Sequence, residues 1–262
     1  MLAYFKVEFN RTIKSPSFIK ALLIGFVIVI VHQLLINRFV ENGEGNVFLY
    51  ALGFENTYML RDIYYLLFPI IVALAGSDLF GEDSRSQSYH LIRSRVSKSH
   101  YFTVKIMLSF LFGGLVFIIP LLVDFLILLM MYPAKSPDIF LRISPVEYGD
   151  VMTSLFVDFP VIYWLIFLLF AFMFGGIFSW IGFLTSLFTV NKYLILLIPF
   201  FAYYGLWVIL SLIGFPEWSP FGFLKPLQGY TTVSITAILL EMVTGIGLIL
   251  LLMIGKSKNE FL

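Results

Sequence analysis

The sequence contains no cysteine, and charged side chains are scarce. Without cysteine the chain cannot form disulfides, iron–sulfur clusters or cysteine-ligated zinc sites. Only 13% of its 262 residues are charged, whereas a soluble domain has about 25%. The net charge is +1 and no long basic tract exists, so nucleic acid is not an expected partner. This shortage of charge excludes an ordinary water-soluble globular fold.

Apolar residues fill the chain instead, since 60% of it is hydrophobic and 30 residues are Phe. About 20 mostly apolar residues are enough to cross a bilayer as a helix. We therefore expect an all-α membrane protein with six transmembrane helices. The expected spans lie at about 18–36, 63–80, 106–131, 161–189, 193–213 and 232–254.

The distribution of Lys and Arg predicts the orientation of these spans, because cytoplasmic loops are enriched in positive charge. With the N-terminus inside, twelve Lys and Arg lie on the inner side and five on the outer side. We therefore expect both termini in the cytoplasm, with 255–262 as a short cytoplasmic tail.

The segment 1–17 before the first span has an amphipathic pattern. Leu2, Phe5, Phe9 and Ile13 share one helical face, and Lys6, Asn10 and Lys14 share another. A basic amphipathic helix of this kind is expected to lie in the inner surface of the membrane. The alternative is a cytoplasmic extension of the first span.

The loop 81–105 is the one sizeable cytoplasmic loop in this topology. It begins with Glu82 and Asp83, and Tyr89, Ile92 and Val96 then form an apolar stripe at helical spacing. A short amphipathic helix here would pack on the membrane or on a partner protein. The alternative is a basic loop that only sets the topology.

Three acidic residues, Asp78, Asp124 and Glu241, fall inside apolar runs. An ionised acid at mid-bilayer costs about 2.5–3.5 kcal/mol on insertion scales, so each needs water, a partner or a proton. They either line a polar path and carry protons, or are neutralised by hydroxyl groups or protonation.

Small residues form a strip along the fourth span, where they let another helix approach closely. The strip consists of Gly175, Ser179, Gly182 and Ser186. We interpret it as a helix-packing seam.

Motifs for catalysis or nucleotide binding are missing. Gly255-Lys256-Ser257 resembles the end of a phosphate-binding loop, but Leu250 replaces the first glycine of that motif. The histidines, His32, His90 and His100, are too scattered in sequence for a metal site. We therefore predict a protein that is not an enzyme and binds no cofactor or metal itself.

The organisation of the chain resembles an ABC-2 type transporter permease, the membrane subunit of a bacterial ABC exporter. The specific likeness begins at Gly76-Ser77-Asp78-Leu79-Phe80-Gly81-Glu82, which is similar to the family's second span ending at a Glu. Further similar segments are Ser94-Arg95-Val96-Ser97 with Tyr101 and Lys105, then Thr189-Val190-Asn191-Lys192, and Ser219-Pro220-Phe221. The likeness covers nearly the whole chain in architecture. The chain departs from the family at Ser86-Gln87, where Gly-Thr is frequent, and lacks the usual Pro near Val96.

The resemblance implies a subunit of the bacterial cytoplasmic membrane that exports a peptide, a lipid-like molecule or a drug. A separate ATPase subunit would bind ATP and Mg and hydrolyse the ATP, and a second permease chain, identical or related, would complete the transporter among membrane lipids. The loop would act as the coupling helix, with Tyr89, Ile92 and Val96 as the anchor in the ATPase and Arg93 and Arg95 as its charged rim. The stretch 214–231 would form a re-entrant hairpin.

Three other functions remain open from the sequence. A secondary transporter could run on protons through Asp124 and Glu241. An intramembrane hydrolase would need a nucleophile and a base, which the spans do not show. A membrane immunity protein would bind a toxin without ATP.

Overall fold

The computed structural model describes residues 2–39, 46–54, 59–134, 152–227 and 234–259, and these residues form helices and connections without any strand. Five helices in this part are long and apolar enough to cross a membrane, which makes the chain a multi-pass membrane protein. They are α2 (Pro16–Phe39), α8 (Lys98–Met131), α10 (Pro160–Ser186), α11 (Lys192–Leu212) and α13 (Ile235–Asn259).

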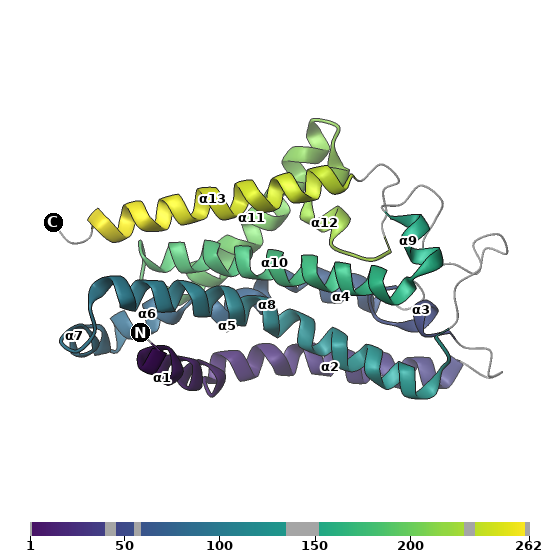
Figure 1. The fold of residues 1–262 in the computed structure, drawn as a ribbon, viewed down its shortest axis with the longest axis horizontal. Coiled ribbons are helices and arrows are strands. Elements are labelled where there is room, and N and C mark those ends of the chain that lie inside the picture. Colours follow the sequence, from purple (N-terminus) through teal and green to yellow (C-terminus); the bar gives the residue numbers. More distant parts are fainter. Residues whose placement is uncertain (1, 40–45, 55–58, 135–151, 228–233, 260–262) are drawn as a thin grey trace.

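The span expected at 63–80 is not one continuous helix. The structure has three short helices there, α4 (Leu60–Leu66), α5 (Phe68–Gly76) and α6 (Leu79–Arg85), which follow one another along the bundle (Figure 1). Pro69 has no N–H to donate to the carbonyl four residues earlier, which interrupts the helix after α4. At the second break the Ser77 hydroxyl donates to the Ser179 carbonyl of α10, at 3.0 Å. The expectation of a single helix is corrected accordingly.

Six further helical segments are short. They are α1 (Leu2–Ile13), α3 (Val47–Tyr50), α7 (Ser88–Arg93), α9 (Thr153–Asp158), the 3-10 helix η1 (Pro216–Trp218) and α12 (Pro220–Phe223). α1 ends and α2 begins on either side of Ser15, whose hydroxyl accepts the Phe18 N–H at 3.2 Å. The chain turns at this point.

The long helices lie side by side, and α10 occupies the middle, where it contacts α5, α8, α11 and α13 (Figure 1). Two ends of the bundle can be distinguished. The end that carries α1, α6 and α7, together with the last turn of α13, is here called the α1 end. The opposite end carries α3 and α9 and is called the α3 end.

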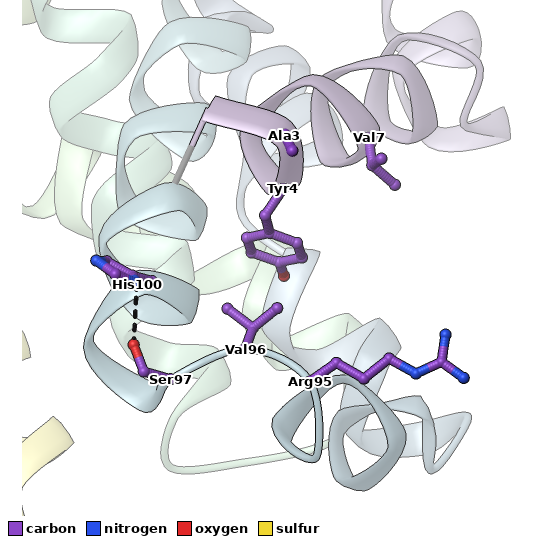
Figure 2. A pocket seen from close by; sticks show the side chains of 7 residues that line it. All are labelled: Ala3, Tyr4, Val7, Arg95, Val96, Ser97 and His100. Carbon is purple, nitrogen blue, oxygen red and sulfur yellow. Dashed lines mark hydrogen bonds between the residues drawn. The ribbon is translucent and has the colours of Figure 1, made fainter.

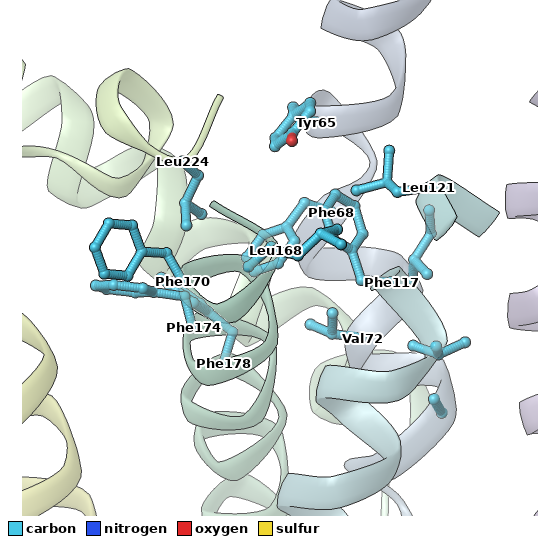
Figure 3. Packing of buried hydrophobic residues seen from close by; sticks show 14 of the residues in the cluster. Tyr65, Phe68, Val72, Phe117, Leu121, Leu168, Phe170, Phe174, Phe178 and Leu224 are labelled. Carbon is cyan, nitrogen blue, oxygen red and sulfur yellow. The ribbon is translucent and has the colours of Figure 1, made fainter. Parts of the chain in front are cut away.

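Aromatic side chains fill the interior between α5, α8 and α10 (Figure 3). The Phe117 ring lies 4.5 Å from the Tyr64 ring and 4.7 Å from the Phe68 ring, measured between centroids. Phe68 in turn contacts Phe178 at 5.7 Å. Such pairs contribute about 0.5–1.5 kcal/mol each beyond the burial of their area.

Small residues allow α8 and α10 to approach closely. A Cβ atom added to Gly175 would lie 2.9 Å from the Gly113 carbonyl oxygen, and one added to Gly113 would overlap the Ser179 side chain. The Ser179 hydroxyl donates to the Ser109 carbonyl at 2.9 Å. Further along the strip, Gly182 faces Ser77, and the buried Ser186 hydroxyl donates to the Phe183 carbonyl. The close contact of α8 with α10 therefore lies at Gly175 and Ser179, whereas Gly182 faces the break between α5 and α6.

The stretch expected as a re-entrant hairpin, 214–231, is described as far as residue 227. Phe223 and Leu224 are fully buried, and the Phe223 ring lies 5.1 Å from Phe174 of α10. The Pro226 carbonyl accepts the Tyr163 hydroxyl at 2.8 Å. This stretch therefore turns into the bundle, while 228–231 and the tail residues 260–262 lie outside the described residues.

Candidate functional site

Four charged side chains meet at the α1 end, where α1, α6 and α8 come together. Lys105 of α8 is completely buried, and its Nζ lies 2.7 Å from Oε2 of Glu8 and 2.7 Å from Oδ2 of Asp83. Nζ also donates to the Leu79 carbonyl at 3.3 Å. Both carboxylates are buried, with 2% of Glu8 and 1% of Asp83 exposed. A single lysine thus joins three helices.

Arg11 and Tyr101 complete this arrangement. Arg11 donates to Oδ1 of Asp83 at 2.5 Å and to Oε1 of Glu8 at 3.3 Å, and the Tyr101 hydroxyl donates to Oδ2 of Asp83 at 2.7 Å. Glu8, Arg11, Asp83 and Lys105 are here called the ion-pair cluster. Its two cations and two carboxylates cancel in charge, which is the condition under which buried charges are tolerated.

Burial by itself would raise the pKa of Asp83. The charges of Lys105 and Arg11 and the hydrogen bonds from Lys105 and Tyr101 outweigh that effect, so the pKa of Asp83 lies below its ordinary value. Asp83 is therefore ionised at neutral pH. It accepts from four side chains, because the Ser88 hydroxyl also donates to its Oδ1, at 3.5 Å.

The buried face of α1 differs from the face that the sequence predicted. Glu8 and Thr12 are the buried residues of α1, and Tyr4, Phe5 and Phe9 pack beside them against the core. Leu2 is 87% exposed and Ile13 is 41% exposed. Of the four residues expected to form the apolar face of α1, Phe5 and Phe9 therefore pack against the core, whereas Leu2 and Ile13 are exposed. The polar anchor Glu8 fixes the rotation of the helix.

α7 rests on this cluster. The Tyr89 ring lies 5.5 Å from Phe80 and 5.3 Å from Tyr101, which itself holds Asp83. Ile92 and Val96 are half-buried and pack against the core of the same chain. The stripe that we expected to anchor an ATPase thus contacts its own chain.

The outward face of α7 is different in character. Leu91 is 74% exposed, and His90, Arg93 and Arg95 are exposed near it, as is Glu82 on α6. A groove runs between α1 and this segment, with the Tyr4 ring directed toward Val96 and the Arg95 side chain extending outward (Figure 2). The exposed side of α7 is the part that a partner could reach.

Asp78 and Glu241, two of the three acidic residues in the spans, have different surroundings. Asp78, between α5 and α6, accepts a hydrogen bond from Arg85, whose other nitrogen donates to the Val190 carbonyl at 3.0 Å. Glu241 is half-buried on α13, and its buried Oε2 has no hydrogen-bond partner in the part of the chain that the structure describes. Asp78 therefore forms a local ion pair with Arg85, whereas Glu241 forms none among the described residues.

Asp124, the third acid, is almost completely buried on α8 toward the α3 end. Its Oδ1 lies 2.6 Å from Nδ1 of His32 and 2.8 Å from Nε2 of Gln33, both on α2. Its Oδ2 accepts the backbone N–H of Leu52 at 2.8 Å. The sequence suggested hydroxyl partners or protonation for this acid, and the structure instead gives it an imidazole, an amide and a backbone N–H.

The sequence analysis did not identify Glu8, Arg11 or His32 as functional residues. Glu8 is the only acid in an otherwise basic segment, and that contrast was the available signal. His32 lies inside an apolar run, where a titratable side chain needs a partner. Lys105 and Tyr101 appeared only through the family likeness.

Comparisons with family models, curated proteins and solved structures each found no match. The interpretation of the site therefore depends on the residues and contacts of this chain.

Proposed function

We propose that the chain is the membrane subunit of an ATP-driven exporter of the ABC-2 type, and that a separate ATPase subunit docks at α7. In this proposal ATP and Mg are bound by the ATPase, and a second permease chain completes the transporter. The contact surface in this proposal is the exposed face of α7, with Leu91 and Arg93, together with Arg95 just after the helix.

The observation that carries the proposal is the attachment of α7 to the ion-pair cluster. α7 is held through Tyr89 to Tyr101, and Tyr101 is bonded to Asp83. Asp83 is bonded to Lys105 of α8 and Arg11 of α1. A force on α7 is therefore transmitted at once to α1, α6 and α8, as coupling by rigid-body movement requires.

The path of the chain also supports the proposal. α4 and α5 run from the α3 end toward the α1 end alongside α2, α8 and α10, and α6 follows them at the α1 end (Figure 1). In our proposal α4 and α5 form a broken second span. Counted with the five continuous helices, this segment gives the six crossings that we propose. Because Lys and Arg gather toward the α1 end, that end faces the cytoplasm in our proposal.

The test is co-purification from the native host in mild detergent, with partners identified by mass spectrometry. We expect an ATPase with a phosphate-binding loop at one copy per chain. Leu91→Asp should reduce its recovery at least about tenfold, because a charge would replace the exposed apolar contact. Ser99→Asp, which adds the same charge at an exposed position of α8, is the matched control and should retain the ATPase.

Either of two results would contradict the proposal: no ATPase in the purified complex, or equal ATPase recovery with both variants. Tyr89→Asp and Ile92→Asp are unsuitable here because both side chains are half-buried and pack against the core of the same chain. The proton-driven transporter that the sequence left open would instead show transport by the purified chain alone. Asp124→Asn or Glu241→Gln would abolish that transport.

A further inference from the structure

A cavity lies at the α1 end, where the turn between α1 and α2 meets the first turn of α6. It is here called the α1–α6 cavity. Its volume is about 370 Å³, and sites for small ligands typically have about 300–1,000 Å³. Polar side chains line it together with Pro16, and they include Asn10, Arg11, Lys14, Ser15 and Glu82. Its size and its polar lining suit a small charged ligand.

The charged groups at the α1–α6 cavity balance one another in number. Arg11 uses two of its five N–H donors on Glu8 and Asp83, and its side chain is still 37% exposed. Burial by itself would lower the pKa of Arg11, and the charges of the three nearby carboxylates, Glu82 among them, outweigh that effect. Lys14 and Glu82 are exposed, and neither forms an ion pair with another residue that the structure describes. Beyond the neutral ion-pair cluster, the cavity therefore offers one positive and one negative charge.

Two uncharged side chains add hydrogen-bonding groups to the cavity. The Asn10 side chain is exposed and makes no hydrogen bond to another described residue, so its amide can donate and accept. The Ser15 hydroxyl accepts the Phe18 N–H at 3.2 Å, which leaves its own O–H to donate. A phosphate group has only acceptor oxygens near neutral pH, so it fits these donors together with Lys14.

The α1–α6 cavity lies at the membrane interface. Ser15 stands just before the apolar run of α2, which begins at Phe18. Glu8 of α1 bonds to Lys105, the residue directly before the apolar run of α8 that begins at Ile106. α1, α6 and the start of α2 lie together at this end of the bundle (Figure 1). The cavity is thus at the level where two spans enter the hydrocarbon, which is the level of the lipid headgroups.

An exposed apolar stripe on α2 starts at the cavity. Pro16 lines the cavity, and the residues that follow it at helical spacing share its face of α2. Their side chains are 45% to 61% exposed, and they are Ile19, Leu23, Val27, Ile30 and Leu34. A molecule with its polar group in the cavity can therefore lay an acyl chain along α2, which favours a lipid over a soluble ligand.

We propose that the α1–α6 cavity binds the headgroup of a phospholipid whose phosphate carries a primary ammonium group, as in phosphatidylethanolamine. The phosphate accepts from Lys14 and Arg11, and the ammonium group donates to Glu82. The headgroup has one charge of each sign, as the cavity does. Phosphatidylglycerol offers Glu82 only hydroxyl groups, and phosphatidylcholine has no N–H. The site contains no residue of α7 and does not depend on the proposed function.

The test measures lipid binding by the full chain, purified in detergent and freed of lipid. Phosphatidylethanolamine, phosphatidylglycerol and phosphatidylcholine with identical acyl chains are titrated separately, and native mass spectrometry gives the bound fraction. We expect phosphatidylethanolamine to bind about fivefold more tightly than phosphatidylglycerol, which is the upper range for one exposed ion pair. Phosphatidylcholine should also bind less tightly, because its cation cannot donate a hydrogen bond.

Two variants separate the roles of the two charges. Glu82→Gln should make phosphatidylethanolamine and phosphatidylglycerol bind equally, because the partner of the ammonium group is lost. Lys14→Gln should weaken both lipids by a similar factor, because both carry the phosphate. Glu217→Gln in η1 and Lys192→Gln at the start of α11 remove the same charges outside the cavity. These matched controls should bind all three lipids as the parent does.

Equal binding of phosphatidylethanolamine and phosphatidylglycerol by the parent would overturn the proposal, and so would a preference that persists in Glu82→Gln. The comparison in the parent needs no variant to fold. Soluble O-phosphoethanolamine carries the same two charges without acyl chains. It should displace the lipid only at concentrations at least about a hundredfold higher, because it lacks the apolar contact with α2. Displacement at equal concentrations would assign the cavity to a soluble ligand and contradict the lipid site.

Discussion

The two ends of the bundle are held together by different physical means. At the α1 end, Lys105 and Arg11 face Glu8 and Asp83 in a buried group whose charges cancel. At the α3 end, the rings of Phe48, Phe54 and Phe156 pack against one another, and Asp124 makes the polar contact.

Because of this difference, substitutions at the two ends should affect stability in different ways. A group of mutually neutralising charges loses its balance when one member is removed, and the remaining charges are then buried without partners. An aromatic cluster loses packing area in proportion to what is removed. The α1 end should therefore be sensitive to single charge changes, and the α3 end to changes of side-chain shape.

Removal of Lys105 is the strongest test of this difference. Lys105→Met should lower the free energy of unfolding by about 3–5 kcal/mol, because Glu8 and Asp83 would share only Arg11. The measurement is unfolding by SDS in mixed micelles, followed by tryptophan fluorescence. Adding Glu8→Gln and Asp83→Asn to the same chain should recover more than half of the loss. Equal stability of Lys105→Met and the parent would show that the cluster is not needed.

The stability of the close contact between α8 and α10 should depend on side-chain volume and not on charge. Gly113→Ala should cost about 1–3 kcal/mol, since the new Cβ would overlap Ser179 and crowd the Gly175 carbonyl of α10. Gly205→Ala is the matched control, because nothing lies within 4 Å of a Cβ at that position of α11. Thermal unfolding in detergent should show no loss of stability for this control. Equal losses for the two variants would mean that the close approach does not matter.

A hydroxyl in the core allows a finer test. Tyr64→Phe should cost about 1 kcal/mol, because the buried Phe117 carbonyl loses its donor. Tyr203→Phe removes a buried hydroxyl that has no hydrogen-bond partner among the described residues. It should therefore leave stability unchanged or raise it slightly. Chemical unfolding of both variants in micelles measures this difference, and a larger loss in Tyr203→Phe would contradict the hydrogen-bond assignment.

The smallest expected effect is the acid sensitivity of the α1 end. Because the pKa of Asp83 is lowered from its ordinary value of 3.8, its contribution to stability is present above about pH 4. That contribution is lost as the pH falls through the lowered pKa. Melting temperatures measured from pH 6 to pH 3 should fall less steeply at the acid limit in Asp83→Asn. Curves of melting temperature against pH with the same slope in both proteins would show that Asp83 does not contribute to acid unfolding.

Hydropathy predicted the membrane character of the chain and the places of its continuous apolar helices, because both depend on local composition. It placed the start of the third span at residue 106, whereas α8 begins at Lys98. The first two turns of α8 are polar, so an apolar window does not detect them. The break after α4 is explained by Pro69, and the break before α6 lies where the Ser77 hydroxyl bonds to the Ser179 carbonyl of α10. The second of these could not be read from the sequence.

The candidate sites were harder to predict, because their partners are distant in the sequence. Lys105 meets Glu8 across 97 residues, and Asp124 meets His32 across 92. The expected stripe of the loop packs against the core, but α7 ends at Arg93, before Val96. Periodicity alone does not say whether a face turns toward a partner or toward its own chain. The position of Asp124 inside an apolar run was a useful signal, because an acid in a span needs a partner, and the structure shows these partners on α2 and at Leu52.

The inward position of Tyr89 and Ile92 has a consequence for how α7 meets a partner. The side that remains outward carries Arg93 and Arg95 around a single leucine. A surface of this composition attracts an acidic protein over distances of about 8–10 Å, and dissolved ions shorten that range. In the proposed complex, assembly at α7 should therefore weaken as ionic strength rises, and isolation in concentrated salt should lose the proposed ATPase that dilute buffer retains.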